Sequence, residues 1–326
     1  MFNPFYFCKN LILKVYNSIS AFHSLTKTVI TLGTFDGVHV GHQSIIEKLK
    51  ACSFGCNYES VVLTFFPHPR MVLQQDVSIQ LLNTIDEKAL LLDRFGVDNL
   101  IVHPFDEAFS NLSAEEFVRQ ILVDKLNVYK IIIGYDHRFG KNRTADINDL
   151  VLFGKKYGFE VEQIGAHEID EIAISSTKIR SALSDGNITL ANQFLGYAYF
   201  ISGEVIEGKK IGRTIGFPTA NIQISEDYKL LPKKGVYVVA AKIKSTLFFG
   251  MMNIGTNPTV GINEQSIEVH FFDFNSDIYK ERLEISILEY VRGEQKFESL
   301  ELLQQQLEKD KVFSLEFIRS NESNFI

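Results

Sequence analysis

The first part of the chain alternates short apolar runs with longer segments that suit helices. The apolar runs occupy residues 29–32, 61–65, 99–102, 130–133 and 159–164. Helical segments lie between them, and those at residues 84–95 and 113–126 begin with the capping boxes Thr84/Glu87 and Ser113/Glu116. Strands that alternate with helices at this spacing predict a parallel, doubly wound α/β sheet.

The pattern changes after Gly186. Residues 187–197 suit a connecting helix, and from Phe200 onward polar and apolar residues alternate within runs that turn residues separate. These runs are residues 200–206, 235–241, 247–254, 267–272 and 283–291. We expect no helix among them, so they predict a small antiparallel barrel or sandwich. Residues 297 to about 309 predict an amphipathic helix that closes the chain.

A chain of 326 residues exceeds what one hydrophobic core usually serves, so we expect two domains. The change of pattern places them at residues 14–186 and 187–326, with a linker at about residues 184–199. Residues 1–13 are apolar and aromatic, but they lack the basic front, long apolar centre and small-residue cleavage site of a signal peptide. We interpret them as an N-terminal extension, either disordered or the product of an upstream start codon.

Composition and charge narrow the class of protein. The net charge of −7 lacks the basic excess of a nucleic-acid binder. The three cysteines, Cys8, Cys52 and Cys56, show no metal-type pairing, so a reduced, cytoplasmic setting fits best. No apolar run approaches the length that spans a bilayer. We therefore expect no nucleic-acid or membrane partner, and a monomer or weak oligomer.

The turn at residues 32–42 lies between an apolar run and a helical segment at residues 43–50, where phosphates commonly bind. His39 and His42 are three residues apart, so both imidazoles can face one side and donate hydrogen bonds to a polyphosphate. Three glycines let a ligand approach the backbone: Gly33, Gly37 and Gly41. The alternative is a glycine-rich turn with two incidental histidines. The sequence of a P-loop is absent.

Two further loops follow predicted strands, where ligands gather in open α/β sheets. Residues 66–70 contain two prolines, so we expect a loop and no helix there. Taken by itself this loop, with His68 and Arg70, is better explained as a solvated turn, and only its position after a strand favours a ligand contact. Residues 134–141 place Asp136 beside an aromatic residue between two glycines, which suits a flat heterocycle, although a charged surface loop is the alternative.

Residues 174–180 begin a helix with hydroxyl groups at its N-terminus. Such hydroxyls are first of all good N-caps. Lys178 and Arg180 oppose the helix dipole in the first turn unless an anion lies there, which favours a phosphate contact.

The segment at residues 208–221 lies inside the β region. Its glycines recur every four residues with basic residues between them, as in a loop that wraps phosphates with backbone N–H groups. Pro218 stiffens the exit and sets Thr219 and Asn221 on one side of an extended segment. Their neutral oxygens suit Mg²⁺ held together with ATP. The alternative is a hairpin connection.

Glu268 lies between apolar neighbours on a predicted strand, from which a carboxylate can take a proton from a substrate hydroxyl. Exposed glutamates are common on strands, so the residue pattern alone also allows a surface position. Arg292, just past the last predicted strand, is a weaker candidate for substrate contact.

Taken together, these motifs resemble those of the prokaryotic bifunctional riboflavin kinase/FAD synthetases, from about Lys14 to the end of the chain. Residues 33–42 are similar to that family's His-x-Gly-His signature, and residues 208–221, which end in Pro-Thr-Ala-Asn, resemble its riboflavin kinase signature. The resemblance implies a Rossmann-like nucleotidylyltransferase domain followed by a small antiparallel β-barrel kinase domain with a C-terminal helix.

The resemblance also implies roles for individual residues. His39 and His42 would stabilise adenylyl transfer, and Glu268 would be the base for the ribityl 5′-hydroxyl. ATP in the first domain would contact Gly33, Phe35, Asp36, Gly41, Ser176, Thr177 and Arg180. Flavin or nucleotide would lie near His68 and Asp136. ATP in the second domain would contact Gly208, Gly212, Arg213, Gly216, Pro218 and Thr219. Arg292 would bind flavin, and Thr219 and Asn221 would hold Mg²⁺.

The function implied is phosphorylation of riboflavin to FMN, followed by adenylylation of FMN to FAD with release of pyrophosphate, both with ATP and Mg²⁺. A nucleotidylyltransferase of another substrate would share the first domain but leave residues 208–221 unexplained. A non-catalytic flavin-binding protein would bind flavin without turning over ATP.

Overall fold

The computed structural model describes residues 13–73, 79–135, 137–165, 174–208, 211–256 and 265–322. Its contacts divide this part of the chain into two compact units that meet in sequence between Ser175 and Ser176. This division precedes the boundary expected at Gly186, so the helix that starts at Ser176 is described with the second unit. The predicted domain limits themselves stay a prediction.

The first unit is built on a sheet whose six strands run parallel, which confirms the predicted α/β class. The strands are β1 (Lys14–Tyr16), β2 (Thr28–Leu32), β3 (Glu59–Phe66), β4 (Asn99–Pro104), β5 (Val128–Gly134) and β6 (Glu160–Ile164). Their order is β1-β4-β3-β2-β5-β6. The pattern missed β1, because three residues carry no measurable periodicity.

Helices connect these strands. They are η1 (Ile19–Ala21), α1 (Val40–Cys56), α2 (Pro69–Leu73), α3 (Ile85–Arg94), α4 (Glu107–Ser110), α5 (Ala114–Glu116), η2 (Phe117–Val123), η3 (Lys141–Arg143) and α6 (Ile147–Tyr157). Both predicted capping boxes are present, Thr84 with Glu87 and Ser113 with Glu116. The expectation of no helix at residues 66–70 was wrong, because α2 begins at Pro69. Proline is well placed at the first position of a helix, where its missing N–H has no partner to lose.

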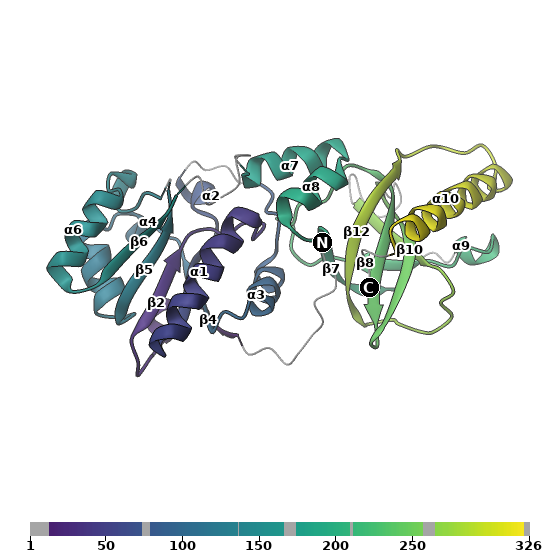
Figure 1. The fold of residues 1–326 in the computed structure, drawn as a ribbon. Helices are drawn as coiled ribbons and strands as arrows, with labels where there is room; N and C mark the ends of the chain where they lie inside the picture. The colour runs from purple at the N-terminus through teal and green to yellow at the C-terminus, as the bar shows by residue number, and fades with distance from the viewer. Residues whose placement is uncertain are drawn as a thin grey trace. The chain divides into compact units, whose positions relative to one another are not determined.

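Both faces of this sheet are buried, as parallel sheets require. Alternate residues of the central strands, such as Ile30, Leu63 and Ile131, share one apolar cluster with residues of η2. The residues between them, such as Val29 and Val62, are also inaccessible to solvent. Helix α1 packs on β2, β3 and β5 and is seen beside β2 in Figure 1.

The order of the strands creates a switch point at β2. From β2 the chain passes through α1 to β3 on one side, and it later returns to β5 on the other side. In open α/β sheets, ligands bind in the crevice at the carboxyl ends of the strands at such a point. The turn after β2 and the loop after β5 are therefore the segments that border this crevice.

The second unit is a closed antiparallel barrel, which settles the predicted choice between a barrel and a sandwich. Its strands are β7 (Phe200–Ile206), β8 (Ala220–Gln223), β9 (Gly235–Ile243), β10 (Thr246–Thr256), β11 (Gln265–Phe271) and β12 (Arg282–Arg292), in the order β10-β11-β8-β7-β12-β9. Helices α7 (Ser176–Asp185) and α8 (Ile188–Leu195) precede it and pack on each other. The expectation of no helix among the strands was wrong, because the short α9 (Ile211–Thr214) precedes β8.

The closing helix, α10 (Leu300–Ser320), is longer than expected. The pattern predicted an end near Lys309, but apolar residues continue on the same face. Leu315 and Ile318 pack on buried residues of β9 and β10, including Val236 and Met251. Figure 1 shows α10 lying over the barrel beside β10.

We expect Thr84→Ala to destabilise the first unit by about 1–2 kcal/mol, the usual cost of losing an N-cap. The Thr84 Oγ1 accepts a hydrogen bond from the Glu87 N–H at 3.1 Å, and both residues are buried. The alanine leaves this buried N–H without its acceptor. Native-state hydrogen exchange of the buried amides of β3 measures the loss in this unit alone. Thr84→Ser keeps the oxygen and should stay near the wild type. Equal protection in the alanine variant would contradict the capping role.

Candidate active sites

The turn after β2 adopts a backbone that L-residues rarely occupy. Phe35 and Val38 have φ values of 45° and 37°, and Gly37 lies between them at 87°. Such conformations cost about 1–3 kcal/mol each and persist only where the surrounding structure imposes them. Phe35 and Val38 are both buried, and the Val38 N–H donates to the Phe35 carbonyl. Packing therefore holds the turn in one defined shape.

The two histidines of the turn lie against each other. His39 is the N-cap residue of α1, and its ring stacks on that of His42 with centroids 3.7 Å apart and an interplanar angle of 17°. Its side chain makes no capping hydrogen bond to the helix, and a helix N-terminus is a general anion-binding site. His42 lies one turn further along, and its Nδ1 is buried without a hydrogen-bond partner among the described residues.

His42 is a neutral imidazole at pH 7. Burial lowers its pKa well below the ordinary value, and the nearby His39 and Lys88 lower it further. A neutral imidazole can still donate a hydrogen bond from one nitrogen. His42 can therefore donate to a phosphate oxygen without carrying a charge into the stacked pair.

The other end of the turn is tied to the segment that leads into α3. Asp36 is 2% exposed, and its carboxylate accepts a hydrogen bond from the Leu82 N–H at 2.9 Å. Lys88 of α3 is 3% exposed and donates from Nζ to the Thr34 carbonyl at 2.7 Å. Burial lowers the pKa of Lys88 to about 8, against the opposing effect of Asp36.

Sequence reasoning missed Lys88. Its position carried a signal, since it lies three and four residues before Leu91 and Leu92, on the buried stripe of α3. A lysine on that stripe is costly to bury unless a nearby group interacts favourably with its charge.

The structure shows the position of only some of the remaining candidate residues of this site. His68 is half-buried and accepts from the Arg70 N–H at Nδ1. Asp136 lies outside the described residues. Ser176, Thr177 and Arg180 start α7 and belong to the second unit, so the structure does not place them relative to the turn.

In the barrel, the glycine-rich segment passes close to other parts of the chain. A Cβ at Gly208 would overlap the side-chain amide of Asn221, and a Cβ at Gly212 would overlap the Phe217 carbonyl. No larger residue fits at position 212, where the clash is with the backbone, and at position 208 a larger residue would displace the Asn221 side chain. Arg213 is exposed and donates to the Tyr279 hydroxyl at 3.4 Å.

Three oxygen-bearing side chains converge beside this segment. Glu268 of β11 pairs with Asn221 of β8 in the antiparallel register, and such directly opposite residues share one face. The Thr219 hydroxyl donates to a Glu268 carboxylate oxygen at 3.2 Å. All three side chains are half-buried.

A hydroxyl, an amide oxygen and a carboxylate are hard ligands of the kind that Mg²⁺ accepts together with phosphate oxygens and water. Among the described residues, no group of three or more His, Cys, Asp or Glu could hold a metal by itself. The donor set thus fits a metal bound together with a phosphorylated ligand.

Two neighbours of this group were missed from the sequence. Asn253 of β10 lies opposite Glu268 on the other side, so Asn221, Glu268 and Asn253 form a row across three strands. His270 lies two residues after Glu268, and its Nδ1 is 2.8 Å from the Pro218 carbonyl, which is only an acceptor, so this nitrogen carries the proton. Strand pairing, which the single sequence does not show, creates both contacts.

Arg292 is engaged elsewhere in the barrel. Its Nε and Nη2 donate to the two carboxylate oxygens of Asp310 at 2.9 and 2.7 Å, and Asp310 is 2% exposed. This bidentate pair fastens α10 to β12. A flavin contact of Arg292 stays a prediction.

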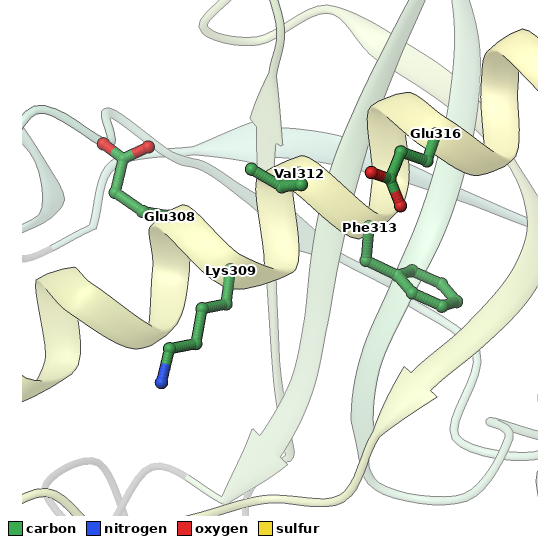
Figure 2. Close-up of a pocket in the computed structure, with 5 residues that line it drawn as sticks. All are labelled: Glu308, Lys309, Val312, Phe313 and Glu316. Carbon is green, nitrogen blue, oxygen red and sulfur yellow. The ribbon is translucent and has the colours of Figure 1, made fainter.

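A surface pocket on α10 does not coincide with either site. Glu308, Lys309, Val312, Phe313 and Glu316 line it, and all five come from this one helix (Figure 2). None of them is a candidate site residue.

Comparison with known proteins identifies the family of each half of the chain. Residues 21–178 match the family model of FAD synthetase, and residues 195–318 match that of riboflavin kinase. The bifunctional riboflavin kinase/FMN adenylyltransferase of Listeria monocytogenes is 41% identical over 87% of this chain and 90% of the relative. The chain belongs to the bifunctional riboflavin kinase/FMN adenylyltransferase family.

A further family member and one solved structure are similar to this chain. The bifunctional enzyme of Haemophilus influenzae is 39% identical over 89% of this chain and 94% of its own. A crystal structure described as a macrolide-efflux protein from Streptococcus pneumoniae is 32% identical, covers 93% of this chain and 98% of that chain, and has a TM-score of 0.82. In the described part of this chain, no helix is long and apolar enough to cross a membrane.

The pKa of Lys88 predicts how stability depends on pH. Its value of about 8 in the folded chain lies below the ordinary 10.5, so the full cost of burying the charge is present below pH 8. Between these values the folded state has released a proton that the unfolded state still binds, so stability rises with pH. Relative to Lys88→Met, the wild type should gain on the order of 3 kcal/mol from pH 8 to above 10.5.

Urea denaturation of both proteins at a series of pH values tests this expectation, with the difference between the two curves as the readout. Groups that titrate alike in both proteins cancel in that difference. A difference that stays flat or falls with pH would show that Lys88 keeps an ordinary pKa.

Proposed function

We propose that the barrel transfers the γ-phosphoryl group of ATP to riboflavin, and that the first unit then transfers AMP from a second ATP to the FMN. The convergence of Thr219, Asn221 and Glu268 on one face of the barrel carries the first half of this proposal. The switch-point position of the turn that holds His39 and His42 supports the second half.

In the kinase step, Glu268 accepts the proton of the ribityl 5′-hydroxyl as its oxygen forms a bond to the γ-phosphorus. The bond to ADP breaks and ADP leaves. A primary alcohol is a weak nucleophile, so a positioned base contributes about 10²–10⁴-fold. Thr219 and Asn221 would hold Mg²⁺, which supplies charge neutralisation at the phosphate oxygens. The segment that wraps ATP includes Gly208, Gly212, Arg213, Gly216 and Pro218.

In the adenylyl step, a phosphate oxygen of FMN forms a bond to the α-phosphorus of ATP, and pyrophosphate leaves. The nucleophile is already anionic, so no strong base is needed and positioning dominates. His39 and His42 donate to the phosphate oxygens where negative charge develops. The ATP contacts of this site are proposed to be Gly33, Phe35, Asp36, Gly41, Ser176, Thr177 and Arg180, with His68 and Asp136 nearer the flavin.

The setting and assembly of the chain are also proposals. Cys52 and Cys56 are free in the structure, which agrees with a reduced, cytoplasmic setting. We place the chain there as a monomer or weak oligomer that binds riboflavin, FMN and ATP.

Glu268→Gln should lower FMN formation from riboflavin by at least about 10²-fold, because the amide cannot accept the proton. FAD formation from supplied FMN should be unchanged. Chromatographic separation of the flavins after incubation with ATP and Mg²⁺ measures both rates. Glu204→Gln, at an exposed position of β7 in the same barrel, is the matched control and should behave as the wild type. Unchanged FMN formation in Glu268→Gln would refute the base.

Combining His39→Ala with His42→Ala should make FMN accumulate from riboflavin and ATP, while FAD formation falls by about 10²–10³-fold or more. The kinase rate of the same preparation serves as the internal reference. The control is His23→Ala, which changes an exposed histidine of the same unit. If FAD formation persists at the wild-type rate, this turn is not the adenylylation site.

A further inference from the structure

Lys88 is a buried cation that has no part in the reaction steps proposed above. Its side chain enters the protein from the first turn of α3, and only 3% of it is exposed. A lysine charge is expensive to bury, so a protein that keeps one needs a compensating interaction. Here the compensation comes from the turn after β2, where Nζ donates to the Thr34 carbonyl at 2.7 Å.

The segment before Lys88 contacts the same turn a second time. The Leu82 N–H donates to the Asp36 carboxylate at 2.9 Å. Between these two contacts, the buried capping box of Thr84 and Glu87 fixes the start of α3. Residues 82–88 therefore form a rigid clamp that holds the turn at Thr34 and at Asp36, on both sides of the strained Phe35.

The charge of Lys88 also acts on His42. It lowers the pKa of His42, although burial and the neighbouring His39 have larger effects. The pKa of Lys88 itself is lowered by burial, and the nearby Asp36 raises it in part. An anionic ligand at the first turn of α1 would gain from the same positive charge. One side chain thus contacts the turn and also lowers the pKa of His42.

We propose that Lys88 is a positioning residue for adenylyl transfer: through its hydrogen bond to the Thr34 carbonyl it holds the turn in the shape that aligns His39 and His42. This inference rests on the proposed function of the first unit. It adds a residue that lies on a separate helix and outside the glycine-rich motif.

The test compares Lys88→Met, which keeps the length and apolar stem, with Lys125→Met, which changes an exposed lysine of the same unit. In Lys88→Met, kcat and kcat/KM for FAD formation from FMN and ATP should both fall by about 10²-fold, the cost of a displaced catalytic group. FMN formation from riboflavin should stay at the wild-type rate and show that the chain is folded and active. Lys125→Met should match the wild type in both steps.

A second readout does not depend on catalysis. Titration of ¹⁵N-labelled histidines by NMR should show a higher pKa for His42 in Lys88→Met than in the wild type, because the nearby charge is gone. If Lys88→Met does not fold, Lys88→Gln, which keeps a donor without the charge, is measured in the same way.

The outcomes separate this inference from the proposed function. Wild-type FAD formation in Lys88→Met, or an unchanged His42 titration, would overturn the positioning role while leaving the adenylylation site intact. A higher KM for ATP with unchanged kcat would make Lys88 an ATP-binding residue instead and would equally overturn it. Absence of FAD formation in the wild type would refute the proposed function, and the NMR titration would still decide whether Lys88 acts on His42.

Discussion

The hydrogen-bonded register between β8 and β11 is the constraint on which the barrel site depends. It sets Asn221 opposite Glu268, and the pairing of β11 with β10 adds Asn253 on the other side. A shift of one residue would turn every side chain of β11 to the other face of the barrel. The close fit of Gly208 against the Asn221 side chain is part of the same constraint. The glycine-rich segment thus ends on a fixed row of polar groups.

Register has the same importance in the first unit, where the strands are parallel. The pairing of β2 with β3 and β5 brings the ends of these strands to one edge of the sheet. The turn after β2 then needs support, because Phe35 and Val38 occupy unfavourable backbone conformations. That support comes from residues 82–88, which are distant in sequence. The two candidate sites therefore differ in construction: one is a polar row on paired strands, and the other is a turn held by residues 82–88.

The sequence predicted the elements that have a strong period and the motifs that lie within one segment. Strands such as β7 were placed correctly, as were the capping boxes of α3 and α5. Short elements were missed: β1 and β8 have three and four residues, too few for a period. Contacts between segments were also missed, since nothing within α3 says that Lys88 meets Thr34, and nothing within β10 says that Asn253 meets β11. Asp136 lies outside the described residues, and its predicted role stays untested.

In the proposed function one chain uses two ATP molecules differently, transferring the γ-phosphoryl group of one and the AMP of the other. Parallel incubations of the purified chain with riboflavin, Mg²⁺ and either γ-³²P-labelled or α-³²P-labelled ATP test it most directly. We expect γ-label to enter both FMN and FAD, whereas α-label should enter FAD alone. FAD that carries no γ-label, or FMN that carries α-label, would contradict it.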